Sequence, residues 1–336
     1  MRLQSYRFAA SRATDHANWM MPDAVIPPHA GSRYRGRFAP SPTGPLHFGS
    51  LVAAVGSFLE ARAHHGDWLL RIDDLDRPRC PPQHAQTILQ QLEAFGFAWD
   101  GEVVWQSRRD EAYRAAFERL RDAGLLYPCA CTRRELTDSR VGTASDGSAI
   151  YPGTCRGGMP AGRDARAWRL QVGDAVVAFN DALQGPQQSR LAADAGDFVL
   201  WRADGLFAYQ LAVVVDDHEA GITQVVRGAD LLASTPRQCF VHRCLGLPAP
   251  AYAHLPVVLG RDGQKLSKQT LACALDPARG GEALVAALDF LGQAPPPALA
   301  AEGMDAIWAW ARENWSLSRV PRRQGLAYNG FQEEAR

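Results

Sequence analysis

The sequence predicts an α/β fold that begins with a parallel sheet, and three observations support this class. Tyr34 to Ala39 alternates like a short strand, and Trp68 to Ile72 is a compact apolar run typical of a buried strand. Each is followed by a segment with apolar residues at helical spacing, at 46–65 and 83–95. An alternation of strands and helices is typical of a parallel sheet covered by helices.

Length and composition exclude several classes of protein. The 336 residues suffice for about two domains. No apolar run approaches the ~20 residues of a membrane-spanning helix, so an integral membrane protein is excluded. The 36 basic residues balance the 36 acidic ones, which excludes a polycation. A nucleic-acid partner stays possible because it needs only a local basic face.

Cysteine usage and the first residues bear on location. The odd number of cysteines, seven, argues against a disulfide framework and favours a reducing cytoplasm. Residues 1–33 contain no apolar core longer than Phe8 to Ala10, which argues against a secretory signal. We therefore expect a cytoplasmic protein with a loose extension at 1–33. No strongly apolar surface element stands out, so we also expect a monomer.

The rest of the chain continues the pattern with one interruption. Further helices are predicted at 110–123, 238–245, 282–291 and 304–315, strands at 167–172, 176–180, 221–227 and 254–259, and an apolar segment at 207–215. Between 128 and 160, cysteines, glycines and small polar residues replace the periodic pattern. This divides the main domain into halves at 34–127 and 161–259, separated by an insertion at 128–160. A polar loop and helical region at 260–292 and a short helical tail at 293–336 follow. We expect the tail to be weakly ordered from Ser318 onward.

The turn after the first predicted strand is a candidate anion site. It reads Arg35-Gly-Arg-Phe-Ala-Pro-Ser-Pro-Thr-Gly-Pro-Leu-His-Phe-Gly-Ser50. The N-terminus of the following helix offers unpaired N–H groups to an anion, and His47 at this place can donate to phosphate. Gly49 allows close approach to the backbone. The alternative is a structural turn with an incidental histidine.

A polar loop late in the chain is a second candidate phosphate site. It contains Lys265-Leu-Ser-Lys268-Gln269 after a predicted strand. Two lysines three residues apart with a serine between them can bind a polyphosphate. The alternative is an ordinary solvated loop.

The insertion carries a candidate metal site. Cys129 and Cys131 are separated by one residue, and Cys155 follows within the same loop-rich segment. Three thiolates and one oxygen or nitrogen donor would complete a tetrahedral zinc shell. Such a segment has too few apolar residues to fold alone and needs a cross-link such as a bound metal ion to stabilise it. The other four cysteines are assigned to the core or the surface.

Taken together, the two phosphate-site segments resemble the signatures of class I aminoacyl-tRNA synthetases, usually written His-Ile-Gly-His and Lys-Met-Ser-Lys-Ser. They stand in the same order, with Lys268 following His47 by 221 residues. The lead-in to His47 has the form seen in glutamyl and glutaminyl enzymes, and 71–77, 209–217 and 226–230 also resemble the glutamyl subfamily. The resemblance runs from about Arg35 to Leu291. It implies a Rossmann-type parallel sheet with a small zinc-binding insertion and a short helical C-terminal part.

The insertion is similar to the zinc site of the small glutamyl-queuosine tRNA(Asp) synthetases, in which tyrosine takes the fourth place. This resemblance implies that Cys129, Cys131, Tyr151 and Cys155 bind one structural zinc ion. Only 67 residues follow Gln269, too few for the large anticodon-binding region of glutamyl-tRNA synthetases. In this the chain again resembles the glutamyl-queuosine enzymes, which attach glutamate to the queuosine base of tRNA(Asp).

The resemblance also implies roles for individual residues. His47, Lys265 and Lys268 are expected to stabilise the phosphates of ATP together with Mg²⁺, and Gly49 and Ser267 to complete the ATP site. Binding of L-glutamate is expected at Arg37, Phe38, Ala39, Pro40, Ser41, Asp73, Tyr209 and Arg227. Among these, the two arginines would bind the carboxylates, Ser41 and Tyr209 would add hydrogen bonds, and Asp73 would face the ammonium. For Arg227 and Asp73 the alternative is a surface ion pair.

Three positions depart from the family pattern. Asp73 stands where relatives commonly have glutamate, so its carboxylate reaches one methylene less far. Gln269 and Ser50 replace the last residues of the two signatures, changes that members of the subfamily tolerate. The expected partners are ATP, L-glutamate and queuosine-containing tRNA(Asp), without a membrane. Two alternative functions remain: a truncated tRNA(Glu) synthetase and an inactive tRNA- or zinc-binding module.

Overall fold

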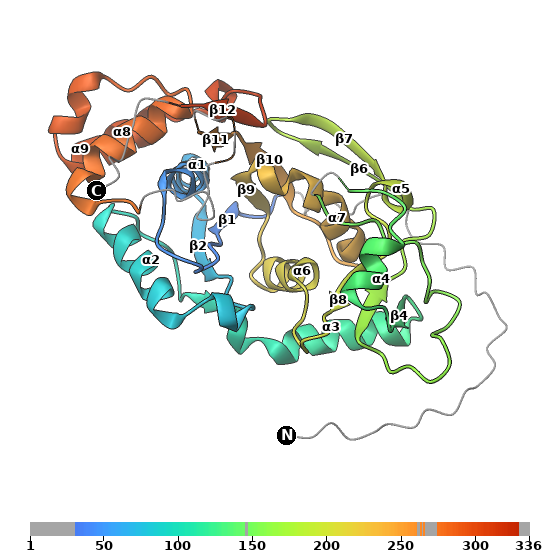
Figure 1. Ribbon diagram of the computed structural model, residues 1–336. Helices are drawn as coiled ribbons and strands as arrows, with labels where there is room; N and C mark the ends of the chain where they lie inside the picture. Colours follow the sequence, from blue (N-terminus) through green and yellow to red (C-terminus); the bar gives the residue numbers. More distant parts are fainter. Residues whose placement is uncertain (1–30, 145–146, 261–262, 264, 266–273, 329–336) are drawn as a thin grey trace.

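The centre of the protein is a set of parallel strands with helices on both faces (Figure 1). A computed structural model describes residues 31–144, 147–260, 263, 265 and 274–328. The parallel strands at the centre include β1 (Arg35–Phe38), β2 (Asp67–Ile72), β3 (Val104–Trp105), β9 (Gln224–Gly228) and β10 (Ala251–Leu255). The β1-β2-β3 group meets the β9-β10 pair at Thr223, whose amide donates to the Arg35 carbonyl at 2.9 Å.

Alternating side chains of these strands pack into two apolar cores, one on each face of the sheet. On β2, Leu70 and Ile72 lie in one core, whereas Leu69 packs against the other. On β10, Leu255 belongs to the first core and Tyr252 to the second. Successive residues of a strand point to opposite faces, so a sheet buried on both faces is apolar at nearly every position.

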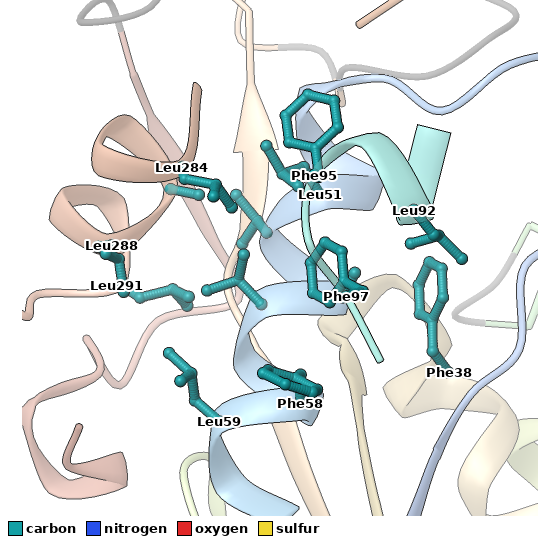
Figure 2. Packing of buried hydrophobic residues seen from close by; sticks show 14 of the residues in the cluster. Phe38, Leu51, Phe58, Leu59, Leu92, Phe95, Phe97, Leu284, Leu288 and Leu291 are labelled. Atoms are coloured by element: carbon teal, nitrogen blue, oxygen red, sulfur yellow. The ribbon is translucent and has the colours of Figure 1, made fainter. Parts of the chain in front are cut away.

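The first core lies around α1 (Figure 2). Its helices are α1 (Phe48–Ala63), α2 (Pro82–Ala94), α8 (Gly280–Phe290) and α9 (Met304–Asn314). The side chains of Phe58 and Phe97 pack edge to face with ring centroids 5.5 Å apart. Trp308 of α9 packs against both rings and donates its indole N–H to the Phe95 carbonyl at 2.9 Å. Helices from the two ends of the chain therefore share one core.

The second core lies under the other face. It is built from α3 (Asp110–Asp122), α6 (Tyr209–Glu219), α7 (Thr235–Cys244), β5 (Ala167–Leu170) and β8 (Phe198–Trp201). An antiparallel sheet joins β4 (Leu126–Cys129) to β5 and β8, and β6 (Val176–Asp181) forms a hairpin with β7 (Gly185–Arg190). The remaining elements are α4 (Arg133–Asp138), α5 (Leu191–Asp194), β11 (Val257–Leu259) and β12 (Gly325–Ala327).

The predicted fold class is confirmed, and most predicted elements occur within a few residues of their expected bounds. The apolar segment at 207–215 is mostly the buried helix α6. The strand expected at 254–259 is divided into β10 and β11 by Pro256, which has no N–H to continue a ladder. In the part of the chain that the structure describes, no helix is long and apolar enough to cross a membrane.

The expectation of a weakly ordered tail is wrong for residues up to 328. β12 pairs in parallel with β11, from Val257 opposite Gly325 to Leu259 opposite Ala327. The Val257 amide also donates to the Gln324 carbonyl at 2.9 Å. Three residues are too few to give a recognisable alternation, so the arginine-rich composition concealed the strand.

Candidate functional site

A cavity of about 520 Å³ opens at the carboxyl ends of β1, β9 and β10. This is where ligands bind in open α/β sheets. Ten of the predicted site residues line it: Arg37, Phe38, Ala39, Pro40, Ser41, His47, Gly49, Tyr209, Arg227 and Lys265. Asp73 is not among the lining residues. Ser267 and Lys268 lie outside the described residues.

His47 is the N-cap residue of α1. Its Nδ1 accepts a hydrogen bond from the Ser50 amide at 3.3 Å. In the neutral ring the proton is then on Nε2, which makes that nitrogen a donor. Ser50, the departure from the first signature, also lines the cavity. The arrangement offers a helix N-terminus and a histidine donor at one place, a combination suited to phosphate.

Lys265, the first residue of the second signature, lies at the same cavity as His47. Its Nζ is 2.6 Å from Oδ2 of Asp230, which also lines the cavity. A Cβ at Gly228 would lie only 2.4 Å from Oδ1 of Asp230. Glycine at 228 therefore leaves room for the Asp230 carboxylate that pairs with this lysine.

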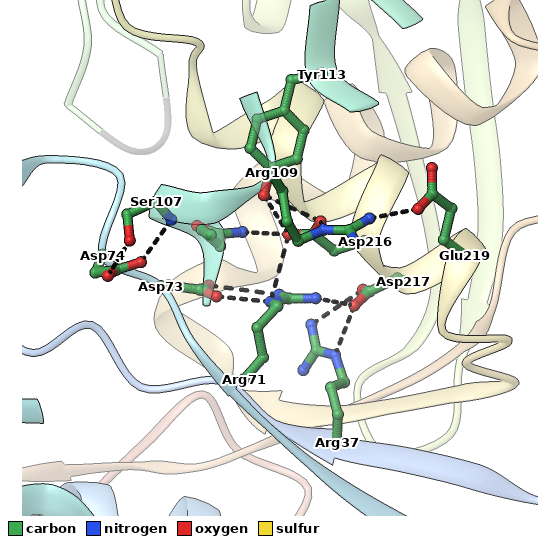
Figure 3. Close-up of polar contacts among 11 residues, drawn as sticks. Arg37, Arg71, Asp73, Asp74, Ser107, Arg109, Tyr113, Asp216, Asp217 and Glu219 are labelled. Carbon is green, nitrogen blue, oxygen red and sulfur yellow. Dashed lines mark hydrogen bonds and ion pairs between the residues drawn. The ribbon is translucent and has the colours of Figure 1, made fainter. Parts of the chain in front are cut away.

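Arg37 belongs to a buried network of arginines and aspartates (Figure 3). Its Nε and Nη2 donate to the two oxygens of Asp217 at 3.1 and 3.2 Å. Arg71 donates to the same carboxylate at 2.6 Å. Burial acts to raise the pKa of Asp217, but the charges of the two arginines hold it down to about 2. Asp217 is thus ionised at neutral pH and fixes Arg37, leaving Nη1 as the nitrogen it does not bind.

Asp73 is held in this network instead of facing the cavity. Arg71 donates to the Asp73 carboxylate through Nε at 2.6 Å, and Asp73 is only 7% exposed. Burial raises the pKa of Asp73 to about 6, outweighing the attraction of Arg71. Asp73 therefore forms an ion pair, but a buried one and not the surface pair that the sequence analysis gave as the alternative. The shorter side chain of aspartate is consistent with a carboxylate that stays against Arg71.

Arg227 is buried at the cavity wall, and no carboxylate of residues 31–144, 147–260 or 274–328 pairs with it. Its Nη2 donates to Thr235 Oγ1 and Gln238 Oε1, both at 2.8 Å, and its Nε donates to His254 Nε2 at 3.1 Å. Among the described residues Nη1 has no hydrogen-bond partner and no acid forms an ion pair with Arg227. The surface ion-pair alternative is wrong for this residue. A buried cation with an open donor suits a ligand carboxylate.

The three cysteines predicted as metal ligands lie together in the insertion. Their sulfur atoms are all within 4.8 Å of one another, with Cys131 and Cys155 at 3.7 Å. The Tyr151 hydroxyl is 3.6 Å from the Cys129 sulfur and 3.5 Å from that of Cys131. Ligands at zinc–sulfur bond length on a tetrahedron are about 3.8 Å apart, so the four donors fit one zinc ion.

A buried arginine supports this cluster. Arg169 donates from Nε to the Cys129 sulfur at 3.3 Å, and its guanidinium carbon lies 3.9 Å from the centre of the Tyr151 ring. Burial acts to raise the pKa of the Cys129 thiol, but hydrogen bonds from Arg169 and Tyr151 lower it below its ordinary value. Cys129 therefore favours the thiolate, the form that binds metal, whereas burial raises the pKa of the Cys131 thiol to about 11.

Three charged residues of the site had no role in the sequence analysis. Asp217 fixes Arg37 and is itself bound by Arg71, and Asp230 pairs with Lys265. All three belong to segments that resemble the glutamyl subfamily, at 71–77, 209–217 and 226–230. An acid in an otherwise apolar helix, as in 209–217, is the signal that marks a buried partner.

Comparisons with known proteins agree with this geometry. Residues 33–279 match the family described as tRNA synthetases class I (E and Q), catalytic domain. A Glutamyl-Q tRNA(Asp) synthetase of Aromatoleum aromaticum is 60% identical over 94% of this chain and 98% of its own length. One from Dechloromonas aromatica is 61% identical over 87% of this chain and 97% of its own length.

Solved structures give the same picture at lower identity. A glutamate-tRNA synthetase from Elizabethkingia anophelis superimposes with a TM-score of 0.71 at 27% identity, covering 89% of this chain and 68% of that one. A glutamate tRNA ligase from Elizabethkingia meningosepticum in complex with its amino acid gives the same values. With the family match extending over most of the sequence, and with His47 of the first signature and Lys265 of the second at one cavity, this chain belongs to the tRNA synthetases class I (E and Q), catalytic domain family.

Proposed function

We propose that this protein activates glutamate with ATP and transfers the glutamyl group to the queuosine base of tRNA(Asp). The observation that carries the proposal is the 60% identity, over nearly the full length of both chains, to a relative named Glutamyl-Q tRNA(Asp) synthetase. The solved glutamate-tRNA synthetases are less than half as similar in sequence. The queuosine acceptor is therefore favoured over tRNA(Glu).

The first step forms glutamyl-adenylate. A carboxylate oxygen of glutamate attacks the α-phosphorus of ATP, and the bond to the bridging oxygen breaks to release pyrophosphate. His47, Lys265 and Lys268 stabilise the charge that develops on the leaving phosphates, and a Mg²⁺ ion bound with ATP would supply further positive charge. Donors placed in advance at developing charge contribute about 2.7–4 kcal/mol each in related chemistry.

Glutamate is bound by the two arginines of the cavity. Arg227 offers Nη1 to one carboxylate, and Arg37 offers the nitrogen that Asp217 leaves open. Ser41 and Tyr209 line the same cavity and supply hydroxyl groups. Asp73 contributes charge balance through Arg71, and contact with the ammonium requires a change in its pairing.

In the second step, a hydroxyl of the queuosine cyclopentene diol attacks the glutamyl carbonyl and AMP leaves.

One structural zinc ion, held by Cys129, Cys131, Tyr151 and Cys155, would stabilise the fold of the insertion. The division of the chain into the segments given above and the monomeric state remain predictions.

The acceptor is tested with labelled glutamate and ATP. The enzyme is incubated with tRNA(Asp) that contains or lacks queuosine and, separately, with tRNA(Glu). Label is expected on queuosine-containing tRNA(Asp) alone, and ribonuclease mapping should place it in the anticodon loop. Equal labelling of both tRNA(Asp) forms, or label at the 3′ end of tRNA(Glu), would contradict the proposal in favour of a truncated tRNA(Glu) synthetase.

A further inference from the structure

Three polar residues stand in a row across three neighbouring strands beside the cavity. Arg227 on β9 lies opposite His254 on β10 in the parallel register. Asp181, the last residue of β6, lies beside β10, whose Tyr252 is its register partner. All three side chains are buried, with His254 fully so. The sheet therefore fixes the backbone positions of an aspartate, a histidine and an arginine in contact.

Asp181 is held firmly and faces one nitrogen of His254. Its Oδ1 accepts from the backbone amides of Leu183, Gln184 and His254 at 2.9–3.1 Å. Its Oδ2 lies 2.5 Å from Nδ1 of His254. Burial acts to raise the pKa of Asp181, but the hydrogen bonds from His254 and the backbone lower it. Asp181 is thus an ionised acceptor, and the proton of the imidazole ring is on Nδ1.

The other nitrogen of His254 must then be an acceptor. Nε2 lies 3.1 Å from Nε of Arg227. An arginine in a protein stays protonated, so its Nε–H can only donate. Burial and the charge of Arg227 lower the pKa of His254 despite Asp181, which keeps the ring neutral. The hydrogen bonds run in one direction, from Arg227 to His254 and from His254 to Asp181.

We propose that His254 and Asp181 are positioning residues that orient Arg227 for the carboxylate of the amino-acid substrate without neutralising its charge. The inference rests on the glutamate site proposed above. Arg37 provides the contrast, because Asp217 binds it directly through two hydrogen bonds. Within the described ranges, the hydrogen-bond acceptors of Arg227 are all neutral, and its Nη1 has no partner. Its charge is therefore available to the ligand.

Asp181→Asn tests the direction of the hydrogen bonds with little change in shape. The asparagine oxygen can still accept the backbone amides, but its amide group donates toward Nδ1 of His254. The ring proton then moves to Nε2 and faces the Nε–H of Arg227. An analogous exchange beside a catalytic histidine, in a serine protease, is known to select the wrong tautomer. The KM for glutamate in ATP–pyrophosphate exchange should rise tenfold or more, with the KM for ATP unchanged within twofold.

His254→Gln is the conservative counterpart. The glutamine amide can donate to Asp181 while its oxygen accepts from Arg227, so the KM for glutamate should stay within about threefold of the wild-type value. His254→Leu removes both contacts and should behave like Asp181→Asn. His242→Gln is the matched control, because His242 is buried on α7 and none of the described contacts joins it to Arg227. It should leave both KM values unchanged.

Arg227→Ala distinguishes a wrong assignment of the glutamate site from a wrong assignment of the positioning role. If this variant leaves the KM for glutamate unchanged, the glutamate site itself is misassigned. If it raises that KM and Asp181→Asn does not, only the positioning role is overturned. If Asp181→Asn raises the KM for glutamate and the KM for ATP equally and also lowers the thermal stability, the residue has a structural role and the positioning role is overturned. Should Asp181→Asn fail to fold, the comparison of His254→Gln with His254→Leu decides, and equal effects of these two overturn the inference.

Discussion

The Asp217 carboxylate serves two buried arginines at once, Arg37 and Arg71. Removing one partner of a buried pair leaves the other charge uncompensated in a medium that solvates it poorly. Arg37 is also a cavity residue, so the contact that stabilises the fold also fixes a side chain of the proposed glutamate site. A single carboxylate thereby couples the fold of the sheet to the shape of the site.

Asp217→Asn is expected to lower the free energy of unfolding by about 3–5 kcal/mol at neutral pH. The pKa of Asp217 is about 2 in the folded protein, below its value of about 3.9 in an unfolded chain. Its contribution is therefore present above pH ~4 and is lost as the pH falls toward 2. Urea unfolding of both proteins across that interval is the measurement. The difference should shrink with acidity, and a pH-independent difference would refute the assigned pKa.

At the scale of elements, the insertion depends on its cysteines because its own apolar core is small. The buried cluster there consists of Tyr127, Cys129, Tyr151 and Cys155, with a few partly buried neighbours. Asp197 ties the insertion to the main domain, since Tyr127 and Arg156 both donate to it. Loss of the proposed zinc ion should therefore loosen the insertion locally and leave the parallel strands in place.

Cys131→Ser should release zinc and expose the segment at 128–160 to proteases. Metal analysis gives the zinc content, and limited proteolysis followed by mass spectrometry locates the cleavage. Cys244→Ser is the matched control, because Cys244 lies on α7 away from the cluster. It should retain the metal. Stoichiometric zinc in Cys131→Ser would exclude Cys131 as a ligand.

Sequence patterns predicted those elements whose burial follows a regular period. Helices such as α1 and α3, and the buried strand β2, have such patterns and occur where expected. The strands β7 and β12 do not, because β7 is polar and β12 has three residues. Their pairing depends on partners far away in the chain, which a local pattern does not reveal.

The site shows the same division. His47 and Lys265 were predicted from signature segments, and both line the cavity. The pairing of Asp73 with Arg71 and of Asp217 with Arg37 was not predicted. Which acid meets which arginine is decided by how β1, β2 and α6 pack, and several pairings satisfy the same sequence.

At the scale of the whole molecule, the C-terminal helices belong to the first core. Trp308 of α9 is only 5% exposed and packs against both Phe58 and Phe97, with each ring-centroid distance at 5.0 Å. Its indole N–H reaches the end of α2 through the Phe95 carbonyl. Stability of the early part of the chain therefore depends on residues more than two hundred positions later.

Trp308→Ala should destabilise the protein by about 3–5 kcal/mol, the usual cost of removing a large buried aromatic side chain. Thermal or urea unfolding provides the measurement. Trp310→Ala is the matched control, because Trp310 lies on the same helix but is only partly buried. Its effect should be clearly smaller. Equal effects would mean that helix propensity, not the shared core, dominates.

The pairing of β12 with β11 places residues 325–327 beside a strand that lines the cavity. Val257 and Val258 of β11 line the cavity, and Lys265 follows a few residues later. A premature stop codon before Gly325 would spare both signature segments and still remove the strand that flanks the cavity wall. We expect the truncated enzyme to keep the residues of both signature segments but to turn over slowly. A late nonsense mutation in this gene should therefore reduce activity.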